Sequence, residues 1–280
     1  MLRIVTDGAA DILPEWGGEY GIDMIPVNIL FGEKSYLQGI ELTNEGFYKL
    51  VDDTKRIPKT SQPSPHQFVE FYRKIAQKGD TILSIHITAK LSGTYTSAIA
   101  AAEELKDEFN IIPIDSACGS LGIGLMCREA RKLERAGKSV EEIVKYVQDI
   151  KYNVRVILTL DTLEYAKMSG RVKTLQAALA SLLNVKPIAI LREGDLNMAE
   201  RVRTRKAALD RVLEIAKNEY GDKPVYLAVV HARDLKSGQG LLEQAKTVFN
   251  HKETMVSELS ISIAANLGPG TVGLILYPLE

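Results

Sequence analysis

Short apolar runs rich in Val and Ile alternate with helical patterns in the first half of the chain. Four of these runs are typical of buried strands: Leu2–Thr6, Ile22–Ile29, Thr81–Ile87 and Ile111–Asp115. The helical patterns lie between or after them, at Pro65–Gln77, Tyr95–Glu108 and Leu121–Ala136. Alternation of this kind favours a parallel sheet with helices on its faces. We therefore expect an α/β fold that begins with a parallel-sheet α/β/α domain over residues 1–153.

The second half of the chain continues the alternation but adds a hairpin. Its strand patterns are Val154–Leu160, Lys186–Leu191, Leu196–Ala199, Val225–Val230, Met255–Glu258 and Thr271–Tyr277. Its longer helical patterns are Lys173–Leu183, Thr204–Glu219 and Gly240–Phe249. The turn Glu193-Gly194-Asp195 is typical of a tight hairpin, which joins antiparallel strands. A hairpin among crossover units predicts a mixed sheet, so we expect a mixed-sheet α/β domain over residues 154–280.

The composition is that of a folded protein with little net charge. Of 280 residues, 45% are hydrophobic and 25% are charged, and the formal net charge of −1 gives no electrostatic reason to expect a nucleic-acid partner. No apolar run reaches the ~18 residues that a membrane span needs. Cys118 and Cys127 are too few for a disulfide framework, and their spacing fits no zinc motif. We therefore expect a cytoplasmic location and no metal.

A hydroxyl-rich segment precedes the first long helical pattern. Within Lys59–Pro65, Ser64 is a suitable N-cap and Pro65 suits the first helical position. This assignment puts Thr60 and Ser61 just before a helix N-terminus, where free N–H groups and the helix dipole favour an anion. The alternative is a helix cap with no further role.

A second hydroxyl-rich segment, Leu91–Ser97, lies between the strand pattern at Thr81–Ile87 and an Ala-rich helix. Its Ser92, Gly93 and Thr94 precede the helix in the same way. Two such helix starts, with no metal cluster or phosphate loop between them, suggest a binding site for a small anionic head group.

Polar residues also follow three of the strand patterns. Asp7 follows the first, His86-Ile87-Thr88 ends the third, and Asp115-Ser116 ends the fourth. In open parallel sheets, ligands bind outside the carboxyl ends of strands, so these segments are candidates to meet in one crevice. The alternative is that the aspartates are ordinary turn carboxylates.

Catalytic motifs have little support. A hydrolase needs a base beside its nucleophile. His86 lies in a strand pattern and is expected in the core, whereas His231 follows a strand and is the better candidate for a site. The glycine-rich stretch 119–124 matches neither a dinucleotide fingerprint nor a Walker loop, and close helix packing is the favoured explanation.

Six motifs occur in the order found in DegV-family proteins. They are Thr60-Ser61-Gln62-Pro63-Ser64-Pro65, Leu91-Ser92-Gly93-Thr94, Asp115-Ser116, Gly170-Arg171, Lys186-Pro187-Ile188 and Gly268-Pro269-Gly270. On this combination the chain resembles the DegV family over essentially its whole length. The resemblance implies the two-domain fold expected above, with a long-chain fatty acid buried between the domains. It also implies a lipid-binding carrier that is not itself an enzyme and needs no cofactor.

The family's binding residues can be carried over by position. The resemblance implies that the carboxylate meets Thr60, Ser61, Ser92, Gly93 and Thr94, with Asn266 and Gly268 near the head group. Two departures stand out. The family usually has His where this chain has Asn266, and its first strand usually ends in Asp-Ser rather than Asp7-Gly8. An amide can donate a hydrogen bond but does not titrate near neutral pH.

A partner kinase follows from the same resemblance. A separate ATP-dependent fatty acid kinase of the DAK type would phosphorylate the presented carboxylate, and Arg171 would stand near the opening to meet it. The expected tail contacts are Ile29, Phe31, Leu121, Leu125 and Met126, although core packing explains the same residues. Transient contact with a membrane stays open.

Two other classes of function remain as alternatives. One is an enzyme that processes its own bound small acid. The other is a regulatory interaction protein that docks an acidic partner on the basic cluster Arg201, Arg203, Arg205 and Lys206, for which a solvated surface is the simpler explanation.

Overall fold

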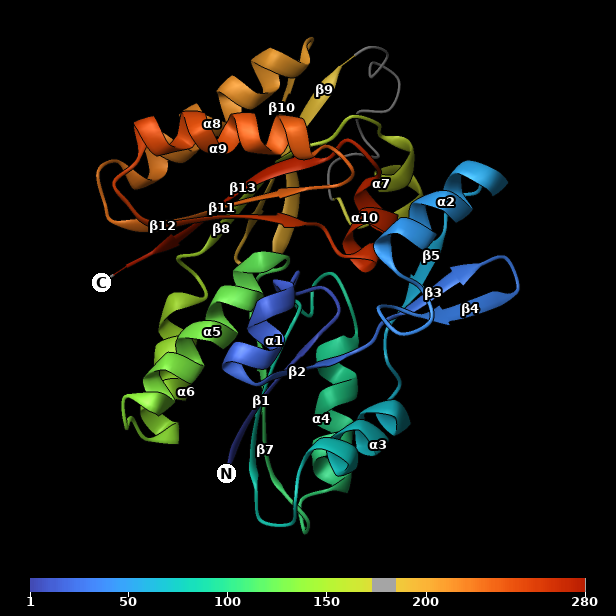
Figure 1. The fold of residues 1–280 in the computed structure, drawn as a ribbon, viewed down its shortest axis with the longest axis vertical. Helices are drawn as coiled ribbons and strands as arrows, with labels where there is room; N and C mark the ends of the chain where they lie inside the picture. The colour runs from blue at the N-terminus through green and yellow to red at the C-terminus, as the bar shows by residue number, and fades with distance from the viewer. Residues whose placement is uncertain (173–184, 280) are drawn as a thin grey trace.

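The computed structural model describes residues 1–172 and 185–279 (Figure 1). The first half is built on a four-stranded parallel sheet in the order β2-β1-β6-β7. Its strands are β1 (Leu2–Asp7), β2 (Ile22–Ile25), β6 (Thr81–His86) and β7 (Asn110–Asp115). The expected parallel sheet is therefore confirmed.

Helices cover both faces of this sheet. One face packs on α1 (Pro14–Tyr20), α5 (Leu121–Arg135) and α6 (Val140–Ile150), and the other on α3 (Pro65–Ile75) and α4 (Thr94–Glu104). Alternate residues of one strand serve the two faces, since Ile4 belongs to the cluster with α5 and Val5 to the cluster with α3 and α4. The result is the expected α/β/α arrangement.

The predicted strand Ile22–Ile29 is wrong as a single element. It is two strands, β2 and β3 (Asn28–Phe31), which belong to different sheets. Pro26 separates them, because proline has no N–H to donate to a ladder and its ring fixes the backbone. A three-stranded antiparallel sheet in the order β4-β3-β5 results, with β4 (Lys34–Leu37) and β5 (Lys59–Ser61) on its edges and α2 (Asn44–Thr54) between them in sequence.

The second half contains a separate mixed sheet in the order β10-β9-β8-β13-β11-β12. Its strands are β8 (Arg155–Thr159), β9 (Lys186–Arg192), β10 (Asp195–Val202), β11 (Val225–His231), β12 (His251–Glu258) and β13 (Val272–Pro278). Of the strand pairs described in this sheet, β11 and β12 run parallel and the other four pairs are antiparallel. The expected mixed sheet and its hairpin at Glu193-Gly194-Asp195 are confirmed, whereas the helix expected at 173–183 lies outside the described residues.

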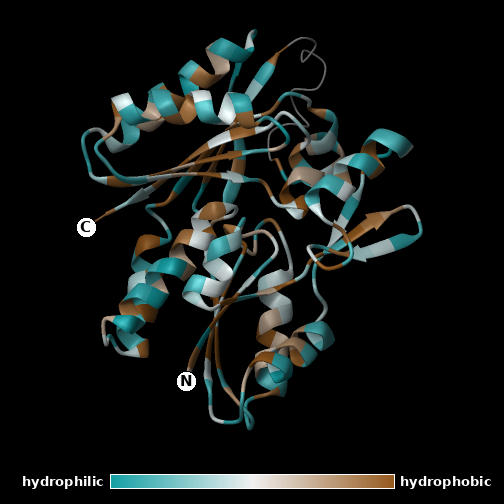
Figure 2. Cartoon of the chain, viewed as in Figure 1, coloured by the Kyte–Doolittle hydropathy of each residue, from teal (hydrophilic) through white to brown (hydrophobic). Residues whose placement is uncertain are grey.

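The two faces of the mixed sheet have different neighbours. Long helices α8 (Arg205–Tyr220) and α9 (Leu235–Val248) cover one face, and hydrophilic and hydrophobic residues alternate along them in Figure 2. The opposite face joins the first half in one hydrophobic cluster, in which Val156, Val230 and Ile275 pack with residues of α5. Because the halves share this core, the division into domains at residue 153 stays a prediction.

A buried arginine crosses the boundary between the halves. The Arg128 side chain on α5 is only 4% exposed, and its guanidinium lies 4.7 Å from the ring centroids of both Trp16 and Tyr226. Its Nη1 donates to Glu253 Oε2 at 2.7 Å, and its Nε donates to Glu129 Oε1 at 3.1 Å. Helices α1 and α5 are thereby tied to strands β11 and β12.

A buried carboxylate forms a second link between the halves. Asp11 Oδ1 accepts from the Ser260 N–H at 2.7 Å, and Asp11 Oδ2 accepts from the Ser120 hydroxyl. Ser260 is the N-cap of α10 (Ile261–Leu267), so Asp11 fixes the start of that helix. Burial raises the pKa of Asp11 from 3.8 to about 6, against the opposing effect of these hydrogen bonds.

Candidate functional site

A cavity of about 760 Å³ lies where segments of both halves meet. The first half contributes residues after β1, on β5 and between β6 and α4, while the second half contributes residues of α10, the start of β10 and Arg171. Its polar wall includes Thr60, Ser61, Ser92, Thr94, Ser262 and Asn266. Cavities of this size and mixed lining are typical of small-molecule sites.

The structure brings most of the predicted head-group residues to this cavity. Thr60, Ser61, Ser92, Gly93, Thr94, Asn266 and Arg171 all line it. Gly268 does not line it but ends α10 with φ 88°, where a Cβ would approach Tyr165 Cδ2 to 2.9 Å. Its backbone therefore favours glycine for reasons of conformation and packing.

Thr60 and Ser61 lie on a short strand that ends just before the predicted helix start. They belong to β5, where Thr60 pairs with Ile29 and Ser61 with Asn28 of β3. The capping prediction itself is confirmed, because Ser64 and Gln67 form a capping box at α3. Ser64 and Pro65 line the cavity too, so the start of α3 also belongs to its wall.

Asn266 joins the strand to helix α10. Its Nδ2 donates to Thr60 Oγ1 at 3.3 Å and to the Ser262 carbonyl at 2.6 Å. The amide thus takes part in the hydrogen-bonded wall of the cavity, next to a hydroxyl that the sequence selected. The hydrogen bond between Asn266 and Thr60 joins the second half of the chain to the first.

The N-terminus of α4 forms the other polar wall. Ser92 Oγ lies 2.8 Å from Thr94 Oγ1 and accepts from the Thr94 N–H at 3.3 Å. Gly93 is the N-cap and has no side chain to satisfy the first-turn N–H groups. A Cβ there would come within 2.3 Å of Gln62 Oε1, so glycine lets the Gln62 side chain lie over the helix start. This end of α4 suits an anionic oxygen.

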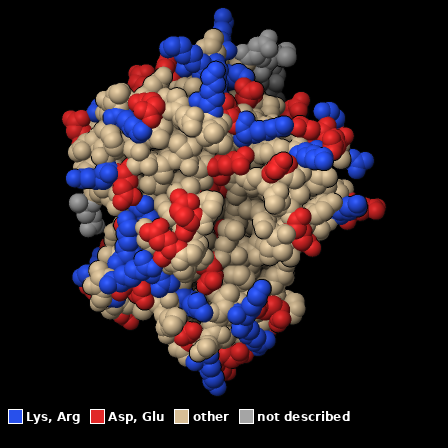
Figure 3. Space-filling view, in the orientation of Figure 1, with Lys and Arg blue, Asp and Glu red and all other residues tan. Residues whose placement is uncertain are grey.

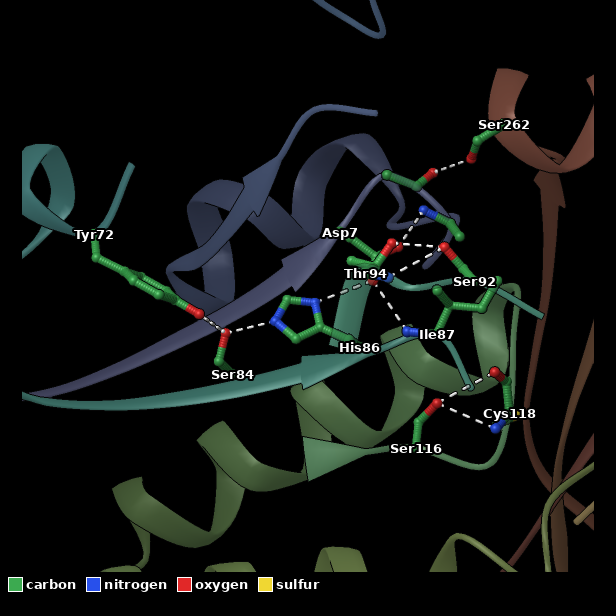
Figure 4. A network of polar contacts seen from close by, with 12 residues as sticks. Asp7, Tyr72, Ser84, His86, Ile87, Ser92, Thr94, Ser116, Cys118 and Ser262 are labelled. Atoms are coloured by element: carbon green, nitrogen blue, oxygen red, sulfur yellow. Dashed lines mark hydrogen bonds and ion pairs between the residues drawn. The ribbon is translucent and has the colours of Figure 1, made fainter. Parts of the chain in front are cut away.

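A fully buried aspartate is part of the cavity wall. Asp7 Oδ2 accepts from His86 Nδ1 at 3.1 Å and from the Ile87 N–H at 3.0 Å, while Oδ1 accepts from the Ala9 N–H at 2.9 Å. These bonds fix the point where β6 turns towards α4 (Figure 4). Asp115 and Ser116, which were candidates to meet Asp7, do not line the cavity.

The histidine continues a chain of hydrogen bonds away from the cavity. His86 Nε2 lies 2.7 Å from Ser84 Oγ, which lies 2.8 Å from the Tyr72 hydroxyl (Figure 4). The expected core position of His86 is confirmed, since its side chain is 0% exposed. His231, the better candidate on sequence, is buried away from the cavity lining, and burial lowers its pKa.

The predicted tail residues lie in the core. Ile29, Leu121, Leu125 and Met126 are fully buried in the main hydrophobic cluster, and partly buried Phe31 packs edge-on against Tyr36 and Phe47. Their role as tail contacts stays a prediction. None of these five belongs to the described lining of the cavity, whose apolar residues are Ala9, Val27, Pro65, Ile87, Ala89, Leu91, Leu196, Ile263 and Leu267.

Charge is sparse in the described part of the cavity lining, where Asp7, Lys90 and Arg171 are the ionisable residues. Lys90 pairs with Asp195, and Arg171 Nη1 donates to the Ser169 carbonyl at 2.5 Å. Elsewhere, Lys, Arg, Asp and Glu are interspersed over the face drawn in Figure 3. In the basic cluster, Arg205 pairs with Asp234 and Lys206 with Asp210.

Residues 1–172 and 185–279 contain no group of three or more His, Cys, Asp or Glu side chains that could hold a metal ion. None of their helices combines the length and apolar character needed to cross a membrane.

Known proteins resemble this chain over nearly its full length. The family model described as "Uncharacterised protein, DegV family" matches residues 1–279. Protein DegV from Bacillus subtilis is 32% identical over 275 residues, which cover 98% of this chain and 98% of that protein.

Solved structures have the same fold. One is described as fatty acid binding of a DegV family protein from Thermus thermophilus, with a TM-score of 0.90, 32% identity and 99% of each chain covered. Another is a fat acid (stearic acid)-binding protein from Eubacterium ventriosum, with a TM-score of 0.91 and 28% identity over 99% of this chain and 98% of that one. With a family model and a relative that both span it almost completely, this chain belongs to the DegV family.

Proposed function

We propose that this chain binds a long-chain fatty acid in the cavity and presents the carboxylate to a separate kinase. The carboxylate lies between β5 and the N-terminus of α4, at Thr60, Ser61 and Ser92, and the acyl tail lies along the apolar lining. The observation that carries the proposal is one cavity with a hydroxyl-rich wall and a separate set of buried apolar residues. The fatty acids named for the Thermus and Eubacterium proteins give the ligand class.

The apolar lining and the hydroxyl-rich wall contribute differently to binding. Each buried methylene contributes about 0.8 kcal/mol, so a tail of about a dozen contributes about 10 kcal/mol before the cost of ordering. A charge-assisted contact to a hydroxyl contributes about 1.5–3 kcal/mol. The tail therefore dominates affinity, and the hydroxyl groups set the orientation of the head group.

The Asp7–His86–Ser84 array argues against hydrolysis by the chain itself. Its order matches a Ser-His-Asp triad, but its direction is reversed, because Asp7 faces the cavity and Ser84 lies behind His86. Ser84 is 0% exposed and does not line the cavity. A nucleophile must reach the substrate, so the arrangement favours carriage over an acyl-transfer enzyme.

Replacing Ser92 with Ala is expected to weaken fatty-acid binding by about 1–3 kcal/mol, because the carboxylate loses a hydroxyl donor. Displacement of a fluorescent fatty acid measures the change. Ser35→Ala, on exposed strand β4, is the matched control and should bind like the wild type. Unchanged affinity in both Ser92→Ala and the Ser92→Ala/Thr60→Ala double variant would contradict the head-group assignment.

Replacing Arg171 with Ala is expected to reduce acyl-phosphate formation at least about tenfold when a cognate fatty acid kinase, ATP and Mg²⁺ are supplied. A fixed cation near the opening orients the carboxylate or stabilises the transferred phosphoryl group. Lipid affinity should stay close to that of the wild type. Lys167→Ala, an exposed cation on α7 (Glu164–Ser169) outside the cavity lining, is the control. Loss of lipid binding with a normal kinase step would assign Arg171 to ligand binding rather than to the kinase step.

A further inference from the structure

The turn of the β9–β10 hairpin rests on the loop between β6 and α4. Lys90 Nζ donates to the Glu193 carbonyl at 2.9 Å and to Asp195 Oδ2 at 2.7 Å. The Thr88 hydroxyl donates to the Gly194 carbonyl at 3.4 Å. All three residues of the turn are thus held by two side chains of the other half of the chain.

The turn lies flush against the loop because its middle residue is glycine. Glu193 and Gly194 have φ of 51° and 83°, as a two-residue hairpin turn of type I′ requires. A Cβ on Gly194 would lie 2.4 Å from Thr88 Oγ1 and 3.3 Å from Lys90 Cδ. A side chain at this position would therefore push the hairpin away from the loop.

The same loop leads directly into the polar wall of the cavity. The Thr88 carbonyl accepts from the Leu91 N–H at 3.1 Å and from the Ser92 N–H at 3.2 Å, which makes the loop a tight turn that ends at the α4 N-cap. Lys90 lines the cavity, and so does Leu196, which follows the hairpin turn and is buried. A displacement of the hairpin would therefore disturb both the head-group wall and an apolar wall.

We propose that Thr88, Lys90 and the turn Glu193–Asp195 form a clasp that holds the cavity closed around its ligand. The members of the clasp are positioning residues, and Lys90 acts through the loop that presents Ser92. This inference rests on the proposed function for its ligand. The contact itself has a readout that needs no ligand, since an opened clasp exposes the backbone of residues 88–94 to exchange with solvent.

Salt, rather than pH, is the expected modulator of the clasp. The hydrogen bond that Lys90 donates to Asp195 raises the pKa of Lys90, with further support from the charges of Glu193 and Asp115, so the ammonium stays charged through the neutral range. The Lys90 and Asp195 side chains are 48% and 27% exposed. Ions in solution therefore screen the pair, and fatty-acid dissociation from the wild type should accelerate as ionic strength rises.

The first test changes the charges of the clasp. Lys90→Met and Asp195→Asn are each expected to raise the dissociation rate of a fluorescent fatty acid about two- to fivefold and to remove most of its salt dependence. The swapped pair Lys90→Asp/Asp195→Lys should return the rate towards that of the wild type. Lys106→Met, which removes an exposed pair with Glu103 on α4, is the matched control.

The second test uses glycine geometry. Gly194→Ala is expected to raise the dissociation rate at least about tenfold and to speed amide exchange over residues 88–94, because its Cβ separates hairpin and loop. Gly137→Ala has nearly the same φ, 82°, but no atom within 4 Å of its Cβ, so it reproduces the backbone penalty without the collision.

The outcomes separate the two proposals. Unchanged dissociation and exchange in Lys90→Met and Gly194→Ala, with the wild type binding fatty acid, would overturn the clasp alone. A wild type that binds no fatty acid would overturn the proposed function. Faster exchange over residues 88–94 in the same variants would then still support the contact between hairpin and loop.

Discussion

Arg128→Ala is expected to lower the free energy of unfolding by about 3 kcal/mol, because a buried cation between two aromatic rings contributes through packing, cation–π attraction and its carboxylate partners together. The guanidinium lies 4.7 Å from both the Trp16 and the Tyr226 ring centroids. Chemical denaturation followed by circular dichroism measures the change. Since these rings belong to different halves of the chain, the variant should also bind fatty acid less tightly.

A surface arginine on the same helix provides the control for this prediction. Arg135 lies 5.4 Å from the Tyr20 ring centroid but is exposed. Its replacement by Ala should cost no more than about 1 kcal/mol, as exposed cation–π pairs do. If Arg128→Ala and Arg135→Ala lowered the free energy of unfolding equally, the position of Arg128 between the halves would add nothing to stability.

Asp11→Asn is expected to stabilise the folded chain by up to about 3 kcal/mol at pH 8. Burial raises the pKa of Asp11 from 3.8 to about 6, so the folded state holds this proton more tightly than the unfolded state does. Wild-type stability from this group is therefore greatest below pH 4 and falls as the pH rises through 6. Asparagine cannot ionise, and its amide can accept from the Ser260 N–H and donate to Ser120 Oγ.

Unfolding titrations of both proteins between pH 4 and pH 8 test this sign. The two curves should converge at pH 4 and separate as the pH rises. Asp80→Asn is the contrasting control, because hydrogen bonds from the Gln77 backbone and the N-terminus lower the pKa of Asp80. Its replacement should destabilise the protein at pH 8. An Asp11→Asn protein that is less stable than the wild type at pH 8 would contradict the assignment.

Local patterns were sufficient for the main elements of the fold. Val- and Ile-rich runs predicted the strands of the parallel sheet, and the turn chemistry of Glu193-Gly194 predicted the hairpin. The three-stranded sheet was missed, because Lys34–Leu37 and Lys59–Ser61 carry no hydrophobic alternation and depend on pairing with β3. Pro26 was the available signal that β2 had to end.

The residues of the site also fall into those that a local pattern predicts and those that depend on contacts between distant segments. Ser92 and Thr94 could be found from the sequence because they stand at a helix start, which is a local feature. Asp7 and His86 meet through the register of β1 against β6, in which Val5 lies beside Ser84. If β1 and β6 had been paired in this register, Asp7 would have been placed beside His86, and their hydrogen bond could have been predicted. Lys90 lies in the loop after β6 and Asp195 begins β10 of the other sheet, so no local pattern predicts that pair.

The cavity wall combines residues of both halves, such as Val27 with Leu196 and Thr60 with Asn266. Under the proposed function, an acyl chain bound there would contact both halves and stabilise their association. A ligand that binds only the folded state stabilises it by about 2.7 kcal/mol at a hundredfold excess over its Kd. Proteases act on the open form, so the empty chain should be degraded faster than the loaded one. Under the proposed function, the supply of fatty acid would then govern how much of this protein a cell retains.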